Sequence, residues 1–246
     1  AYQHWTLKQA IKHASTIITV SNFTKHELMS LYGVPESKLN TVYHGYNKEL
    51  FQKTDPTEAA IVADQYGLKS DNYLIYIGRL EQKKNTPGLI HAFNKIKTIP
   101  EFKDLQLALV GSPGNGYEQI ATAAAISNDV KILGWVPTEH LPHLITASAA
   151  FVFPSFYEGF GIPILEALAC EKLTIASNRE PIREIAGQAV IYFDPNNPKN
   201  MAATIADSLK NRQTLTEKLR PSWLQTTAKF SWQKCAYATL HVLTKS

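Results

Sequence analysis

The sequence predicts an α/β protein with a doubly wound, Rossmann-like parallel sheet. Two observations lead to this fold. Short apolar and β-branched runs alternate with longer helix-like segments along nearly the whole chain, a pattern typical of right-handed βαβ units. With 246 residues, 44% of them hydrophobic, the chain is also long enough to bury a substantial core. Because ligands in such folds bind beyond the carboxyl ends of the strands, we look for functional residues there.

The elements follow one another in a regular order. After a helix-like start, strands are expected at 16–20, 39–43, 73–77, 105–110, 130–133, 149–153, 173–176 and 190–193. Helices are expected at 22–32, 56–66, 86–97, 117–126, 139–147, from 163 onward, and at 181–185, 198–210, 212–228 and 231–243. Ser21 is a suitable N-cap for the first of these helices, and Gly33 and Pro35 end it.

Composition excludes several classes of protein. The net charge of +4 is mild, and no block of Lys and Arg is long enough to indicate nucleic-acid binding. No apolar run approaches the ~20 residues that span a bilayer, and no secretory leader is visible. Cys170 and Cys235 form no metal-like pair, which favours a reducing compartment. The chain begins at Ala1 without methionine, which suggests part of a longer protein.

Residues 152–168 carry most of the functional information. An apolar run ends at Pro154, a glycine-containing loop follows, and Pro163 can open a helix. Glu158 lies in the loop and Glu166 about one turn into the helix, so the loop can fold both around one ligand. The free amides of a helix N-terminus favour anions such as phosphate. This combination predicts a site for a ligand that is both phosphorylated and rich in hydroxyl groups.

The same stretch, Glu158 to Glu166 with Phe160-Gly161 between them, resembles the E-x7-E signature of family 4 retaining glycosyltransferases. The resemblance implies the two-domain GT-B fold, of which this chain is the C-terminal half, and a nucleotide-sugar donor. It implies that Glu166 accepts hydrogen bonds from the ribose and that Glu158 contacts the donor sugar or the charge near its anomeric carbon. It also implies that the backbone of Phe160, Gly161 and Ile162 holds phosphate or sugar oxygens. Two solvated helix carboxylates are the simpler alternative.

A second motif follows the expected strand at 73–77. Residues Gly78 to Lys84 resemble the family's G-R-x4-K element, in which the Arg and Lys bind the donor diphosphate, here Arg79 and Lys84. An arginine fork and a mobile lysine charge suit a diphosphate. Asn85 replaces the usual glycine and tolerates left-handed dihedrals. A solvated charged loop is the alternative.

Two further strand ends carry weaker signals. Gly111 and Ser112 resemble the family's Val-Gly-x-Gly turn beside the nucleotide, although an ordinary tight turn explains them equally well. Trp135 and Val136 resemble the segment that contacts the base, with a core tryptophan as the alternative. The base itself cannot be predicted from these residues.

The resemblance also divides the chain. Residues 42–47 resemble an interdomain N-G-V-D hinge, with His44 and Asn47 in place of its asparagine and aspartate. Phe230-Ser-Trp resembles the closing F-S-W element, where the last helix returns across the junction. The expected segments are 1–46, the tail of an N-terminal acceptor domain; 47–228, the donor domain; and 229–246, the returning helix. The rest of the N-terminal domain is expected to be a necessary partner.

The implied function is retaining transfer of a sugar from a UDP-, GDP- or ADP-sugar to a saccharide or lipid-linked acceptor. Arg79, Lys84 and Glu158 are the expected catalytic residues. No cofactor, protein-bound metal or nucleic acid is expected, and a fragment without the acceptor domain should be inactive. A cytoplasmic location is expected, and peripheral contact with the inner face of the membrane is compatible with the basic charge.

The main alternative is a non-catalytic nucleotide-sugar-binding module or partner subunit. A two-carboxylate glycoside hydrolase leaves Arg79 and Lys84 unexplained, and a nucleotide-sugar epimerase would need catalytic acids of its own.

Overall fold

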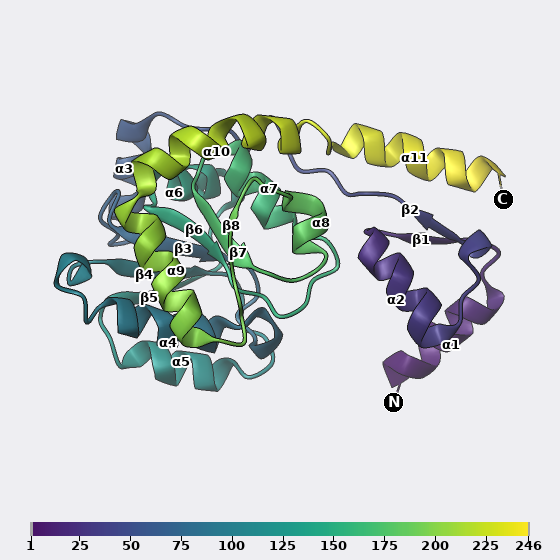
Figure 1. The fold of residues 1–246 in the computed structure, drawn as a ribbon, viewed down its shortest axis with the longest axis horizontal. Helices are drawn as coiled ribbons and strands as arrows, with labels where there is room; N and C mark the ends of the chain where they lie inside the picture. Colours follow the sequence, from purple (N-terminus) through teal and green to yellow (C-terminus); the bar gives the residue numbers. More distant parts are fainter. Residues whose placement is uncertain (1, 246) are drawn as a thin grey trace.

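The computed structural model describes residues 2–245, and their side chains from Trp5 to Thr244. Ala1 and Ser246, the outer bounds of two expected segments, lie outside the described residues. The strands form one six-stranded sheet and one two-stranded sheet, and every pairing is parallel (Figure 1). The strands are β1 (Ile17–Thr19), β2 (Leu39–Thr41), β3 (Tyr73–Ile77), β4 (Gln106–Val110), β5 (Val130–Gly134), β6 (Ala150–Phe153), β7 (Thr174–Ser177) and β8 (Ile191–Phe193).

The helices alternate with these strands as the sequence predicts. They are α1 (Tyr2–His13), α2 (Asn22–Tyr32), α3 (Pro56–Gln65), α4 (Thr86–Ile96), α5 (Tyr117–Ala125), α6 (Leu141–Ala147), α7 (Ile162–Ala169), α8 (Ile182–Ala186), α9 (Pro198–Lys210), α10 (Arg212–Thr227) and α11 (Trp232–Lys245). Short 3-10 helices occupy Glu36–Lys38, Gln82–Lys84, Pro100–Phe102 and Thr138–His140. All the expected strands and helices are present, and their ends differ from the expectation by at most two residues. The expected α/β fold with a parallel sheet is therefore confirmed.

The order of strands in the large sheet fixes where a ligand can bind. The order is β5-β4-β3-β6-β7-β8, so the chain first builds outward from β3 in one direction and then from β6 in the other. Where strand order reverses in this way, the connecting loops leave to opposite faces and open a crevice at the carboxyl ends of the two central strands. That crevice lies beyond Ile77 of β3 and Phe153 of β6.

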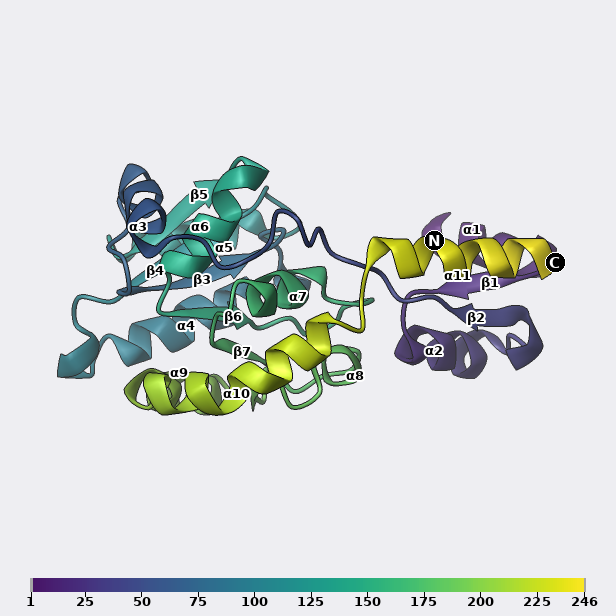
Figure 2. The same ribbon diagram turned by 90° about the horizontal axis from the view of Figure 1, so that it is seen from above.

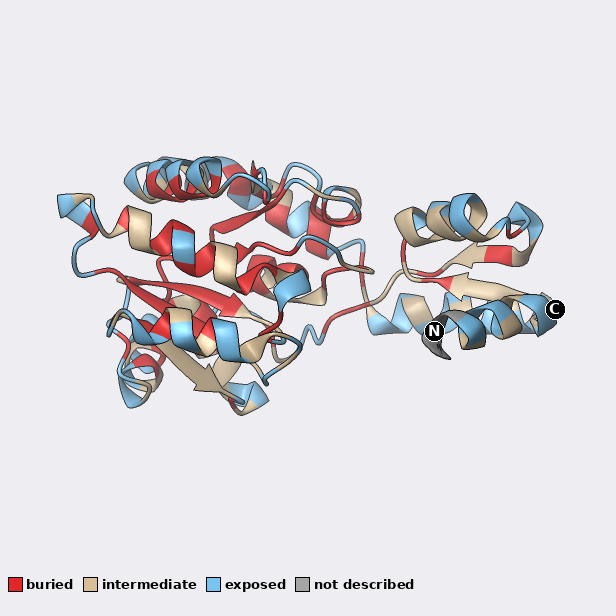
Figure 3. Ribbon diagram, turned by 90° about the horizontal axis from the view of Figure 1, so that it is seen from below, coloured by how far each residue is buried: buried red, intermediate tan, exposed pale blue. Residues whose placement is uncertain are grey.

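The core lies on both faces of this sheet (Figure 3). Side chains of β3 alternate, with Tyr73 and Ile75 in one hydrophobic cluster and Leu74 and Tyr76 in the other, as the period of two in a strand requires. Residues of α3, α6, α7, α8 and α10 complete the first cluster, and residues of α4, α5 and α9 complete the second. Because both faces are covered, the strands are buried apolar runs, which is why they were recognisable in the sequence.

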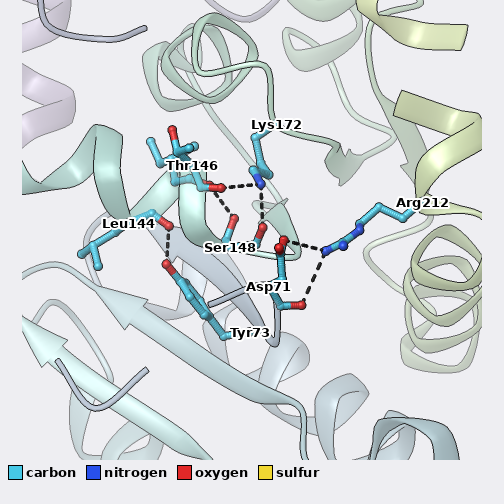
Figure 4. Close-up of polar contacts among 8 residues, drawn as sticks. Asp71, Tyr73, Leu144, Thr146, Ser148, Lys172 and Arg212 are labelled. Atoms are coloured by element: carbon cyan, nitrogen blue, oxygen red, sulfur yellow. Dashed lines mark hydrogen bonds and ion pairs between the residues drawn. The ribbon is translucent and has the colours of Figure 1, made fainter. Parts of the chain in front are cut away.

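The edge of the sheet opposite the crevice is held by polar contacts (Figure 4). The Lys172 ammonium donates to the carbonyl oxygens of Thr146, at 2.7 Å, and Ser148, at 2.6 Å, where α6 ends. Arg212, at the start of α10, binds the Asp71 carboxylate at 3.1 Å. Burial lowers the pKa of Lys172 to about 8. These contacts join α6 and α10 to the loops that enter the strands.

A smaller N-terminal unit stands beside the large sheet (Figures 1 and 2). It comprises α1, β1, α2 and β2, and α11 returns alongside it. Ser21 caps α2 by accepting a hydrogen bond from the Thr24 amide, and Gly33 ends α2 in the left-handed conformation, as expected. The chain crosses between the unit and the large sheet after β2 and again before α11. At Gly45 the two crossings touch, because a Cβ there would lie 2.0 Å from the Trp232 nitrogen.

Candidate functional site

The loops after β3, β4 and β5 form one surface at the carboxyl edge of the sheet. The Gly78 amide donates to the carbonyl of Val110 at 2.9 Å, and the Gly111 amide donates to that of Gly134 at 2.8 Å. Gly111 has φ +141°, and a Cβ on it would lie 2.0 Å from the Gly78 oxygen. Only glycine permits this approach. The turn that carries Gly111 and Ser112 therefore lies directly beside the start of the Arg79 loop.

The loop after β3 presents Arg79 and Lys84. Lys84 ends the 3-10 helix Gln82–Lys84, and Asn85 follows in the left-handed conformation with φ 55°, which the sequence predicted it could adopt. The Asn85 side-chain amide donates to the Pro195 carbonyl at 3.1 Å and fixes this turn. The Phe156 amide donates to the Lys83 carbonyl at 3.0 Å. That bond joins the β3 loop to the loop after β6, which carries Glu158.

Glu158 is held by contacts to both of its oxygens. The Lys84 ammonium donates to Oε2 at 2.5 Å, and the Ser155 hydroxyl donates to Oε1 at 2.7 Å. Ser155 is fully buried, and its carbonyl accepts from the Ser177 hydroxyl at 2.6 Å. Only 18% of the Lys84 side chain and 10% of the Glu158 side chain are exposed. A largely buried carboxylate is thus placed next to a cation in the wall of the crevice.

These groups line one cavity of about 370 Å³. Of the residues predicted from the sequence, it brings together Arg79, Lys84, Glu158, Phe160, Gly161 and Ile162. Its other lining residues are Val20, His44, Tyr76, Ile77, Gly78, Phe153, Gly159 and Pro163. The lining combines the charged side chains of Arg79, Lys84 and Glu158 with aliphatic and aromatic side chains, so the cavity suits an anionic ligand that also has apolar parts.

The remaining predicted residues lie outside the lining of this cavity. Gly111, Ser112, Trp135 and Val136 are on the neighbouring loops after β4 and β5. Trp135 is 74% exposed, so it is not the core tryptophan of the alternative interpretation, whereas Val136 is buried. Glu166 lies on α7, where burial raises its pKa to about 7. Unlike Glu158, it is not part of the cavity wall.

Two lining residues come from outside the large sheet and were not predicted. Val20 precedes α2, and His44 belongs to the first crossing between the two units. The His44 ring lies 5.4 Å from both the Phe160 ring and the Trp232 ring, and burial lowers its pKa. The resemblance marked His44 only as a departure from a hinge motif. Nothing local in the sequence indicates that Val20 reaches the site.

A second cavity, of about 390 Å³, lies at the opposite edge of the sheet. Its charged groups already have partners within the chain: Lys53 contacts Glu171 at 3.5 Å, Arg212 contacts Asp71 at 3.1 Å, and Lys172 donates to two carbonyl oxygens. We therefore assign the candidate site to the cavity at the strand reversal.

Neither a metal cluster nor a membrane span is present in the part of the chain that the structure describes. Within residues 2–245 no three His, Cys, Asp or Glu side chains lie together as ligands for a metal ion. None of the helices described there is both long and apolar enough to cross a membrane.

Comparison with protein families and curated proteins gives consistent matches. The family model described as "Glycosyl transferases group 1" matches residues 61–226, and the model "Glycosyltransferase Family 4" matches residues 1–50. The O-antigen chain mannosyltransferase B of Escherichia coli is 31% identical over 245 residues, which are 98% of this chain and 63% of that protein. The chain thus spans less than two thirds of the length of this relative.

Solved structures share the fold. A glycosyltransferase from Rickettsia africae superposes with a TM-score of 0.83 at 21% identity, covering 98% of this chain and 66% of that one. HepE of Anabaena, determined in complex with UDP and glucose, superposes with a TM-score of 0.85 at 20% identity, covering 99% of this chain and 66% of that one. At these identities the likeness concerns the fold.

Proposed function

Because the chain belongs to the group 1 glycosyltransferases, we propose that it binds a nucleotide-diphosphate sugar and supports retaining transfer of that sugar to an acceptor hydroxyl. One observation carries this proposal: Arg79, Lys84 and Glu158 converge on a single cavity at the reversal of strand order. The curated relative is a mannosyltransferase, and HepE was determined with UDP and glucose. Their names support a nucleotide-sugar donor without identifying its base or sugar here.

The cations and the carboxylate have separate proposed roles. As the bond between the anomeric carbon and the diphosphate oxygen breaks, the diphosphate leaves with the electron pair and gains negative charge. The acceptor oxygen would bond to the anomeric carbon, and its proton would pass to the departing diphosphate. Arg79 and Lys84 would stabilise that charge, aided by the amides at the start of α7. In the structure Lys84 is paired with Glu158, so an entering diphosphate would compete for the Lys84 ammonium. Glu158 would then be available to the donor sugar.

The other predicted residues extend the proposed site along the edge of the sheet. Gly111 and Ser112 would contact the nucleotide from the turn beside Gly78, and Trp135 and Val136 would contact the base from the loop after β5. Glu166 would accept hydrogen bonds from the ribose. The backbone of Phe160, Gly161 and Ile162 would hold phosphate or sugar oxygens.

The wider proposal concerns partners and location. The acceptor, a saccharide or a lipid-linked sugar, would be held by the rest of an N-terminal domain. This agrees with the 63% of the curated relative's length that the chain spans. We propose transfer without a protein-bound metal or cofactor, since two cations and a helix start are available to offset the charge. The free thiols of Cys170 and Cys235 favour the cytoplasm.

The proposal is tested by nucleotide binding to the chain and its variants. Calorimetry with UDP, GDP, ADP and their sugar conjugates should find one nucleotide that binds. Lys84→Met should weaken that binding about tenfold or more, because a hydrogen bond to a charged group is lost. Lys83→Met is a matched control, since the Lys83 side chain is 63% exposed and contacts Glu81 instead. Failure of every nucleotide to bind the unmodified chain, or an equal loss in both variants, would overturn the proposal.

A further inference from the structure

The first turn of α2 is held by a carboxylate from the other unit. Glu184, on α8, accepts from the Asn22 amide at 2.8 Å through Oε1 and from the Phe23 amide at 2.9 Å through Oε2. The first amides of a helix have no partner within the helix and carry partial positive charge. Ser21 satisfies the next free amide, that of Thr24, at 3.1 Å. Glu184 therefore completes the cap of α2 from a position 162 residues away in the sequence.

The same carboxylate also binds the first crossing between the units. The Tyr43 hydroxyl donates to Glu184 Oε1 at 2.8 Å and accepts from the Asn22 side-chain amide at 2.7 Å. Burial, together with the hydrogen bond to Glu184, raises the pKa of Tyr43 to about 12, so the hydroxyl stays a donor. The Tyr43 ring packs edge-on against the Phe230 ring, 5.7 Å away. Glu184 thus joins α2, the first crossing and α8 at one point.

The residues that Glu184 holds are neighbours of two residues that line the cavity. Val20 precedes Asn22 by two positions, and His44 directly follows Tyr43. Val20 lies against the Glu158 loop, since a Cβ on Gly159 would be 3.4 Å from Val20 Cγ2. The N-terminal unit thereby supplies one part of the cavity wall and the first crossing another, and both adjoin the segments that Glu184 holds.

We propose that Glu184 is a positioning residue for the donor site. By holding the start of α2 and Tyr43, it keeps Val20 and His44 in the wall of the cavity that Arg79 and Lys84 also line. The effect of Glu184 on donor binding rests on the proposed function. Its role in joining the two units rests on the hydrogen bonds alone.

A second contact also joins α2 to the loop that carries Glu158. The Tyr157 hydroxyl donates to the Glu27 carboxylate in α2, and the Tyr157 and Phe23 rings lie 5.9 Å apart. Tyr157 directly precedes Glu158 in the sequence. The helix that Glu184 caps therefore also supports the loop that presents Glu158, and moving α2 would disturb both Val20 and that loop.

Hydrogen exchange on the whole chain without ligand tests the junction. Glu184→Gln keeps one oxygen, but its amide nitrogen cannot accept from a backbone N–H. Exchange at the Asn22 and Phe23 amides should rise about tenfold or more, while β3, β4, β6 and β7 keep their protection. Glu217→Gln is the matched control, because Glu217 is an exposed residue of α10 that contacts Gln213 in its own helix. Unchanged exchange at residues 22–23 would overturn the proposal.

Calorimetry of the same variants tests the effect on the site. Glu184→Gln should weaken binding of the nucleotide sugar about five- to tenfold, although residue 184 does not line the cavity; such a loss corresponds to about 1 kcal/mol. The Glu217→Gln control should bind like the unmodified chain. If the unmodified chain binds no nucleotide, the proposed function fails, while the exchange result still decides the junction. If the chain binds and Glu184→Gln binds equally well, the positioning role is wrong.

Discussion

The contribution of Glu166 to the free energy of unfolding depends on pH. Burial raises its pKa from 4.5 to about 7, so the folded chain holds a proton that the unfolded chain has already lost in that range. The stability that comes from the neutral carboxyl is complete below pH 4.5 and is lost as the pH rises through about 7. Glu166→Gln cannot ionise and should be more stable than the unmodified chain at pH 8, by about 1–3 kcal/mol. The difference should largely disappear at pH 4.

Urea unfolding at pH 4, 6 and 8 measures this difference. Glu217→Gln, an exposed carboxylate on α10, corrects for the loss of one surface charge. A stability difference for Glu166→Gln that stays the same at all three pH values would show that the Glu166 carboxylate is solvated in the folded chain. The contribution of burial would then be absent.

The sequence identified these residues better than it identified their surroundings. The pair Arg79 and Lys84 and the residue Glu158 were predicted because each belongs to a local motif at a strand end, and the fold brings strand ends together. The exposure of Trp135 was not predictable, since a tryptophan in a loop fits either a core or a ligand contact. Val20, His44 and Glu184 act through contacts between distant segments, and no local spacing indicates such contacts.

At the scale of the elements, the close contact between the two crossings depends on Gly45, which has no side chain. A Cβ on Gly45 would lie 2.0 Å from the Trp232 nitrogen and 2.2 Å from the Ser231 carbonyl carbon. Both are backbone atoms, so the contact cannot be relieved by a rotamer change. Gly45→Ala should separate the first crossing from the start of α11 and lower the free energy of unfolding by about 2–4 kcal/mol.

Urea unfolding of Gly45→Ala beside Gly33→Ala separates crowding from backbone strain. Gly33 has φ +66° and open space around its missing Cβ, so alanine there meets only left-handed strain of about 1 kcal/mol. Equal losses in the two variants would contradict the close contact of the crossings. The sequence resemblance placed a hinge at 42–47 with a glycine in its motif. The physical reason for glycine at position 45, its contact with the backbone of Trp232, came only from the structure.

The elements of the large sheet were predictable for a physical reason. Strands such as β3 and β6 are buried on both faces, so each is a continuous apolar run that local composition reveals. Helix ends followed from caps such as Ser21 and Gly33. Strand order and the position of the N-terminal unit depend on long-range packing, and they came only from the structure.

At the scale of the whole molecule, the two units should differ in stability. The N-terminal unit has a two-stranded sheet, and α2 buries none of its residues fully. Such a unit is marginal alone, whereas β3, β4, β6 and β7 lie in a core covered on both faces. In native-state hydrogen exchange, amides of β1 and β2 should therefore open at a free energy below that of global unfolding.

Ligand binding should reduce this difference in stability between the two units, because Val20 and His44 line the cavity together with residues of the large sheet. At about 100 times its Kd, a nucleotide sugar stabilises the states that can bind it by about 2.7 kcal/mol. If binding requires both units, the opening free energy of the β1 and β2 amides should rise by nearly this amount. If the large sheet alone forms the site, those amides should exchange as before while β3 and β6 become more protected. Exchange with and without the ligand thus decides whether the N-terminal unit is part of the binding site or only its neighbour.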